Sequence, residues 1–144
     1  MNRDKSKLPA CYAMVLPGLE SVAAEEIKVD LGGAVKKAGR EIVVFRVAEI
    51  DPSILELRTT EDVFLLAWGT DQLHFRAEDL DHIRRWTAQA DWDQLLRIHH
   101  AIRPKPKGKP TYRLVTQKTG EHGYRRTDAR EALAQGLRTQ VTRM

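Results

Sequence analysis

An alternation of strand-length and helix-length segments over residues 10–68 is the feature that most restricts the fold of this chain. Residues 10–16 form a short apolar run of strand length. The Pro17-Gly18 pair is expected to open a helix, because proline is well tolerated in a first turn. Gly32-Gly33 is expected to end that helix, since glycine readily adopts the left-handed conformation found there. The first two elements of this pattern are therefore a strand and an amphipathic helix.

The pattern continues with two extended runs, 34–38 and 41–47, and the second is β-branched and aromatic enough for the centre of a sheet. Asp51 is expected to cap a short helix that begins with Pro52, and 63–68 is the next expected strand. The order β-α-β-β-α-β is typical of a ferredoxin-like split βαβ unit, in which two helices cover one face of a four-stranded antiparallel sheet. The sequence therefore predicts an α+β fold.

The chain as a whole divides into an N-terminal tail at residues 1–9, a ferredoxin-like domain at 10–70 and a second region at 71–144. With 144 residues, the chain has room for one ordinary domain or two small ones. It ends on a helical pattern with no stop signal, so we expect the second region to be truncated at its C-terminus.

The second region is expected to contain two helices, then a strand and a last helix. The helices are predicted at 77–88 and at 92–102, with Asp91 as the N-cap of the second one. Three prolines between residues 104 and 110 prevent further helix, and 111–119 reads as a strand. Thr127 is the expected N-cap of the last helix.

Charge is distributed very unevenly along the chain. Residues 103–144 contain eleven Lys and Arg residues against three Asp and Glu residues, a net charge of +8. The whole chain carries +4, so residues 1–102 carry −4. This asymmetry predicts a polyanionic partner, and nucleic acid is the leading candidate because Lys and Arg contacts to phosphate release condensed counterions.

The basic residues of the last segment surround the start of the last predicted helix. Arg126 and Arg130 lie in its first turns, where backbone amides are suited to bind a phosphate. A lysine-proline loop is often only a solvated linker, and this alternative stays open for the three lysines before residue 110. The predicted RNA-binding residues are Arg103, Lys105, Lys107, Lys109, Arg113, Lys118, His122, Arg125, Arg126, Arg130 and Arg138.

The cysteine, the histidines and the glycine pair of the chain do not form a recognisable catalytic motif. Cys11 is the single cysteine, which excludes an internal disulfide, and its apolar strand favours a buried structural thiol over a nucleophile. His99 and His100 are adjacent on a predicted helix and point roughly 100° apart, so they do not form a chelating pair. Gly32-Gly33 follows a helix and not a strand, which makes it a helix cap and not a nucleotide loop. We expect no catalytic residue, metal or cofactor site in this chain.

Cellular location is indicated only indirectly. The lone cysteine fits a reducing compartment, and no stretch has the length and apolar character of a signal peptide or a membrane span. We therefore expect a cytoplasmic protein.

Four short motifs occur in a specific order along the chain. They are the Pro-Gly-Leu-Glu turn within Tyr12–Glu20, Trp92-Asp93 before a helix, the run 111–122, and Thr127–Arg130 at the last helix start. The run 111–122 looks like a Phe-Arg-Val-x-Arg-x-Gly-x-His strand. Together these motifs resemble the N-terminal region of THUMP-domain RNA methyltransferases, and the resemblance covers residues 10–144.

The resemblance implies that the ferredoxin-like and THUMP parts jointly bind structured RNA, usually tRNA. The family's catalytic half is missing, because its Asn/Asp-Pro-Pro-Tyr/Phe motif has only a distant counterpart in Asp51–Ile54, without the second proline. Its glycine loop for S-adenosylmethionine is missing too. The resemblance therefore implies the RNA-recognition end of a methyltransferase, whose S-adenosylmethionine-dependent catalytic domain is expected in cis after residue 144.

Two other interpretations remain. The same module also occurs in tRNA 4-thiouridine synthetases, although the Pro-Gly-Leu-Glu turn argues against that family. The basic face is also compatible with a protein–protein interaction module that meets an acidic protein.

Overall fold

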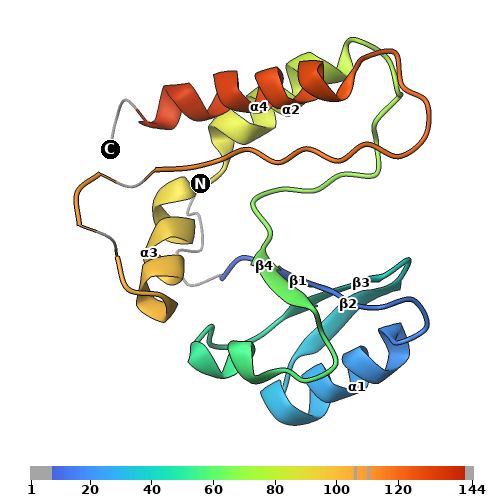
Figure 1. Ribbon diagram of the computed structural model, residues 1–144, viewed down its shortest axis with the longest axis vertical. Coiled ribbons are helices and arrows are strands. Elements are labelled where there is room, and N and C mark those ends of the chain that lie inside the picture. Colours follow the sequence, from blue (N-terminus) through green and yellow to red (C-terminus); the bar gives the residue numbers. More distant parts are fainter. Residues whose placement is uncertain (1–7, 106, 110, 142–144) are drawn as a thin grey trace, which may run out of the picture. The chain divides into compact units, whose positions relative to one another are not determined.

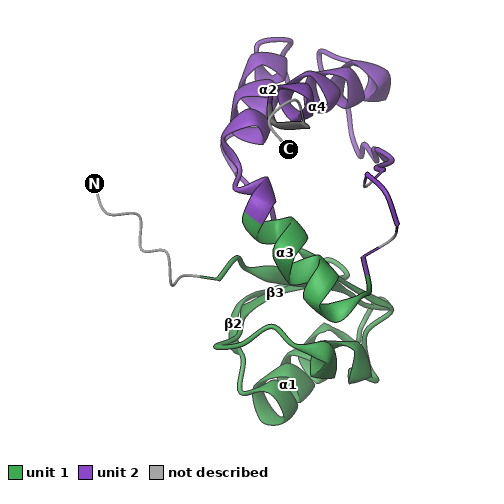
Figure 2. Cartoon of the chain, turned by 90° about the vertical axis from the view of Figure 1, so that its left-hand side faces the viewer, with its two compact units in different colours: residues 1–66, 94–104 green, residues 67–93, 105–144 purple. Residues whose placement is uncertain are grey.

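The computed structural model describes residues 8–105, 107–109 and 111–141 (Figure 1). Most of the predicted tail, residues 1–7, lies outside the described residues. The chain forms two compact units, one made of Met1–Leu66 with Gln94–Pro104 and the other of Ala67–Asp93 with Lys105–Met144 (Figure 2). The fold is α+β, with a four-stranded antiparallel sheet in the first unit and helices in both.

The sheet consists of β1 (Cys11–Met14), β2 (Ala34–Gly39), β3 (Ile42–Arg46) and β4 (Asp62–Leu65), in the order β2-β3-β1-β4. β1 lies in the interior of the sheet, with Cys11 opposite Phe45 of β3 and Leu65 of β4. Alternate residues of a strand point to the same face, and Cys11, Ala13, Val43 and Phe45 are all fully buried. The predicted strand order along the chain is confirmed.

One face of this sheet is covered by α1 (Glu20–Leu31) and by η1 (Pro52–Glu56), a single short 3₁₀ helix. Ala23, Ala24 and Ile27 of α1 and Ile54 of η1 join the buried residues of the strands in one core. Asp51 caps η1 as predicted, because its carboxylate accepts a hydrogen bond from the Ser53 N–H at 2.8 Å.

The ends of α1 show how glycine shapes the first unit. The helix begins at Glu20 and not at Pro17, because Gly18, at φ +88°, belongs to a turn that precedes it. At the other end Gly32 is the predicted left-handed cap, with φ +62°. A Cβ on Gly33 would lie 2.7 Å from the side chain of Ile27, so any other residue here would force Ile27 or the chain to shift.

The helix α3 (Trp92–Ile102) begins and ends where the sequence predicts. Its residues from Gln94 onward belong to the first unit, although the sequence pattern predicts 71–144 as one region. The physical reason is that Ile102 packs against the hydrophobic core of the sheet. In Figure 2, this part of α3 lies on the opposite side of the sheet from α1.

The second unit is built around α2 (Asp79–Gln89) and α4 (Arg126–Val141), which lie side by side in both views. Ile83 and Thr87 of α2 and Ala132, Gly136 and Leu137 of α4 are buried. α2 begins two residues later than predicted, and residues 142–144 of the predicted last helix lie outside the described residues.

The predicted strand at 111–119 is wrong. These residues form an exposed, irregular segment with no assigned secondary structure (Figure 1, orange). A strand requires a hydrogen-bonded neighbour, and every strand pair within the described residues involves β1 to β4. Among the described residues, no helix combines the length and the apolar character needed to cross a membrane.

Candidate nucleic-acid interface

The N-terminus of α4 is capped by Arg125 and Asp128. The backbone N–H of Arg125 donates to Asp128 Oδ2 at 2.9 Å, and the Arg125 guanidinium forms an ion pair with the same oxygen at 3.4 Å. The hydrogen bond from the Arg125 backbone, followed by that from its side chain, lowers the pKa of Asp128. This corrects the predicted cap, because Thr127 lies inside the helix. The carboxylate three residues into the helix reaches back to the cap residue, as in one half of a capping box.

Arg126 and Arg130 project from the first turns of α4. Both side chains are exposed, and neither forms a salt bridge with any described residue. They are four residues apart, which places them on the same side of the helix. The first N–H groups of a helix have no intrahelical partner, and the aligned peptide dipoles add positive potential there. The two guanidinium groups therefore reinforce a location that already favours an anion.

The loop before α4 brings two more predicted residues to this location. Lys118 Nζ donates to the carbonyl oxygen of Tyr124 at 3.4 Å. The His122 ring lies 5.3 Å from the Tyr124 ring, measured between centroids. Tyr124 is buried, and its burial, with a smaller contribution from the charge of Asp79, raises its pKa. The buried tyrosine thus ties Lys118 and His122 to the start of the helix.

We call the set Lys118, His122, Arg125, Arg126 and Arg130 the helix-start surface. The other predicted residues lie elsewhere. Lys105, Lys107, Lys109 and Arg113 are exposed on irregular chain, and Arg103 follows α3 in the first unit. Arg138 is eight residues beyond Arg130, about 12 Å along the helix, and its guanidinium lies 3.6 Å from the carboxylate of Glu131. The structure therefore brings together five of the eleven predicted residues.

Phe75 is a residue that the sequence analysis missed. Its side chain is 55% exposed, and its backbone has φ +62°, in the left-handed region that bulky residues rarely adopt. Its ring meets the ring of His122 edge to face, with 4.8 Å between centroids. No pattern in the sequence marks this contact, because it joins residues from two separate loops.

Two of the three tryptophans of the chain donate hydrogen bonds to Thr87 of α2. Trp68 Nε1 donates to Thr87 Oγ1 at 3.0 Å, and Trp92 Nε1 donates to the Thr87 carbonyl oxygen at 2.7 Å. The Trp86 ring lies 5.3 Å from the Trp68 ring and is stacked on His82 at the same centroid distance. These contacts pair the indole N–H groups of Trp68 and Trp92 and place the Trp86 ring between those of Trp68 and His82.

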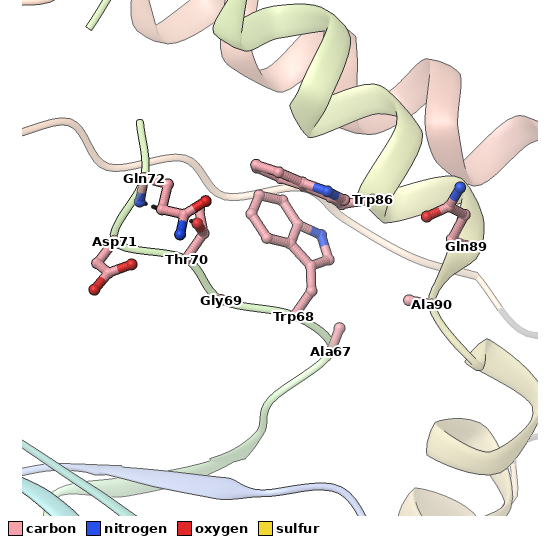
Figure 3. Close-up of a pocket in the computed structure, with 9 residues that line it drawn as sticks. All are labelled: Ala67, Trp68, Gly69, Thr70, Asp71, Gln72, Trp86, Gln89 and Ala90. Carbon is pink, nitrogen blue, oxygen red and sulfur yellow. Dashed lines mark hydrogen bonds between the residues drawn. The ribbon is translucent and has the colours of Figure 1, made fainter. Parts of the chain in front are cut away.

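Beside these rings is a shallow hollow of about 550 Å³, lined by residues 67–72 and by Trp86, Gln89 and Ala90 (Figure 3). Trp68 points toward Trp86 in this view, and Thr70 and Gln72 lie on the opposite side from Gln89. The charged residue of its lining is Asp71, whose carboxylate repels a phosphate. The hollow therefore does not extend the helix-start surface.

Cys11 and the possible metal ligands are the other groups of the chain that could carry chemistry. Cys11 is buried in the core, and burial raises the pKa of its thiol to about 11, so the thiol stays protonated at neutral pH. Among residues 8–105, 107–109 and 111–141, no group of three His, Cys, Asp or Glu side chains is arranged to hold a metal ion. Comparison with protein-family models, with curated proteins and with solved structures found no match to this chain.

Proposed function

We propose that this chain is an RNA-binding module that recognises the shape and phosphates of structured RNA, with tRNA as the leading candidate. The observation that carries the proposal is the helix-start surface. Arg126 and Arg130 stand exposed beside the N-terminus of α4, without salt bridges to described residues. Double-helical RNA is bound mainly through phosphate, 2′-hydroxyl and shape, which suits cationic side chains at a helix start.

The fold supports the same proposal. The strand order β2-β3-β1-β4, with α1 and η1 on one face, agrees with a ferredoxin-like unit in which the second helix is reduced to a 3₁₀ turn. We propose that this unit and the α2–α4 unit correspond to the N-terminal part of a THUMP-type RNA methyltransferase. The proposal includes a cytoplasmic location and an S-adenosylmethionine-dependent catalytic domain in cis after residue 144.

Equilibrium binding over a salt series tests the proposal. A structured RNA hairpin is titrated with the 144-residue chain at several potassium chloride concentrations. If four to six phosphates are contacted, the logarithm of the association constant falls against the logarithm of salt with a slope of roughly −3 to −5. No binding at low salt, or an affinity that does not change with salt, contradicts RNA binding.

The same titration with an acidic peptide of matched charge addresses the main alternative, a module that binds an acidic protein. Equal affinity for the peptide and the RNA at every salt concentration would favour that alternative. The coding sequence after residue 144 tests which class of enzyme the module belongs to. An Asn/Asp-Pro-Pro-Tyr/Phe motif there supports a methyltransferase, and its absence argues for another enzyme such as a 4-thiouridine synthetase.

A further inference from the structure

Phe75 presents an aromatic ring to solvent from a backbone that is unfavourable for it. The side chain is 55% exposed, and the backbone has φ +62°. Its neighbours His74 and Arg76 are exposed polar residues, so the ring is not part of a continuous apolar patch. A left-handed phenylalanine that buries little of its ring receives little packing energy in return for its strain.

The surrounding structure holds this backbone in place. Both the His74 and the Phe75 N–H groups donate to the carboxylate of Asp79, at 3.1 and 2.8 Å. Asp79 is fully buried. On the other side the Gly123 N–H donates to the Phe75 carbonyl oxygen, and a Cβ on Gly123 would lie 3.1 Å from that oxygen. Contacts from the first residue of α2 and from the loop before α4 therefore fix the position of Phe75.

The fixed ring lies next to the helix-start surface. His122 meets Phe75 edge to face, and Tyr124 lies between His122 and the cap residue Arg125 in the chain. Lys118 is bonded to the same loop through the carbonyl oxygen of Tyr124. An exposed aromatic ring beside a row of cations is the combination that binds unpaired nucleotides, because a base stacks on the ring while its phosphate meets the cations.

We propose that Phe75, with His122 beside it, stacks on an unpaired base of the RNA that binds the helix-start surface. The proposal rests on the RNA-binding function given above and adds a second kind of contact to it. The cations bind the backbone of a paired region, and Phe75 selects RNA in which a bulge or loop exposes a base next to that region. Stacking on an aromatic face tolerates any base, so we expect a preference for unpaired structure and not for sequence.

The test compares two RNA hairpins that differ only in a two-nucleotide bulge within the stem, each bound to the 144-residue chain and to its variants. Phe75→Gly removes the ring and also relieves the positive φ, so this variant is expected to fold at least as stably as the parent. Phe75→Leu keeps apolar bulk but has no aromatic face. Phe75→Tyr keeps the aromatic face.

We expect the parent chain and Phe75→Tyr to prefer the bulged hairpin. Phe75→Gly and Phe75→Leu should lose affinity for the bulged hairpin about tenfold more than for the paired one, equivalent to about 1.4 kcal/mol. An aminopurine base placed in the bulge should lose fluorescence on binding the parent chain and retain it with Phe75→Leu, since stacking quenches this base.

Two results would overturn the inference while leaving the proposed function intact. One is salt-dependent binding of both hairpins by the parent chain with no preference for the bulge. The other is a preference that Phe75→Leu and Phe75→Gly both retain. Absence of binding to either hairpin at low salt would instead contradict RNA binding itself, and the stacking proposal with it.

Discussion

Gly136 of α4 lies directly against Thr87 of α2. A Cβ added to Gly136 would be 2.7 Å from the Thr87 Cβ and 2.6 Å from the backbone carbonyl oxygen of Arg84. Thr87 in turn accepts hydrogen bonds from Trp68 and Trp92. Thr87 therefore contacts both α4, the helix that begins with the basic residues, and the two tryptophans that donate to it.

The first prediction concerns Gly136→Ala. Alanine improves helix propensity by about 1 kcal/mol, but here the added methyl meets a backbone oxygen that cannot move without shifting α2. Overpacking of this kind costs about 1–3 kcal/mol, so we expect a net loss of stability in thermal unfolding. Gln135→Ala, on the exposed side of the same helix, is the control and should change stability by less than about 0.5 kcal/mol. A higher melting temperature for Gly136→Ala would show that α2 and α4 do not meet at this residue.

The second prediction concerns Thr87→Val, which keeps the shape of the buried side chain and removes its hydroxyl. Trp68 Nε1 then loses its hydrogen-bond acceptor, while Trp92 keeps the backbone carbonyl. A buried donor without an acceptor costs about 1–3 kcal/mol, and Trp68 is half-buried, so we expect about 1 kcal/mol in urea unfolding. Thr87→Ser retains the hydroxyl and is the control, because Trp68 Nε1 keeps its hydrogen-bond acceptor in this variant. Equal stability of Thr87→Val and the parent chain would mean that water replaces the lost acceptor at no cost.

Local patterns were sufficient to predict the sheet and most helix positions. The β-branched run in β3, the glycine cap at Gly32 and the proline-led turn capped by Asp51 all act over a few neighbouring residues. The same kind of reasoning gave a wrong strand at 111–119. Strand-forming residues alone do not make a strand, because its hydrogen bonds come from a neighbour that the local sequence does not contain.

The candidate site was predictable only in part, for a related reason. The density of basic residues near residue 126 is visible in the sequence, so it predicts that Arg126 and Arg130 lie at a helix start, where the structure places them. The cap was misassigned because Thr127 is the usual residue type for that role, whereas Asp128 reaches back to Arg125 from inside the helix. Phe75 was missed because its placement depends on the distant Gly123, whose N–H donates to the Phe75 carbonyl oxygen, as well as on the nearby Asp79.

The third prediction is a pH dependence from Glu26, which joins α1 to the segment before β4. Its carboxylate accepts hydrogen bonds from the N–H groups of Arg58 and Thr59 and from the Thr59 hydroxyl. Partial burial acts to raise the pKa of Glu26, but the hydrogen bonds from Thr59 and Arg58 outweigh it and lower the pKa below 4.5. A lowered folded-state pKa means that the carboxylate stabilises the fold above about pH 4.5, and that this contribution is lost as the pH falls through the folded-state value.

Glu26→Gln should therefore be less stable than the parent chain at neutral pH, and the difference should shrink at about pH 3. Urea unfolding at both pH values measures it. Glu25→Gln, an exposed neighbour on the same helix, removes the same charge and should show little change at either pH. A Glu26→Gln difference that is constant with pH would contradict the role of the ionised carboxylate.

The fourth prediction concerns Asp128→Asn. In the parent chain, the Asp128 carboxylate stabilises the start of α4 and places a negative charge beside Arg125. Its removal should lower stability slightly and strengthen RNA binding by about two- to fivefold, since the carboxylate no longer competes with phosphate. Glu131→Gln removes an equal charge one turn further along and is the matched control. Equal gains in RNA affinity for both variants would attribute the effect to net charge and not to the helix start.

The fifth prediction concerns the double change Arg126→Ala plus Arg130→Ala. If these side chains contact phosphate, RNA binding should weaken and the salt slope should decrease by about one to two units. Both are exposed and form no salt bridge with described residues, so the free energy of unfolding should change by less than about 0.5 kcal/mol. Salt-series titration and thermal unfolding of the same preparations measure the two effects separately.

Arg84→Ala plus Arg85→Ala is the matched control, because it removes the same charge from an exposed face of α2 in the same unit. Arg84 pairs with Asp81 at 3.6 Å, and Arg85 contacts the His82 ring at 2.8 Å, so these arginines have local partners that Arg126 and Arg130 lack among the described residues. We expect the control to leave the salt slope nearly unchanged. If the stem of Arg130 instead packs along α4, the Arg126/Arg130 variant will melt at a clearly lower temperature and bind RNA with unchanged affinity per folded molecule. That outcome would assign the two arginines to folding and would remove the helix-start surface as the RNA contact.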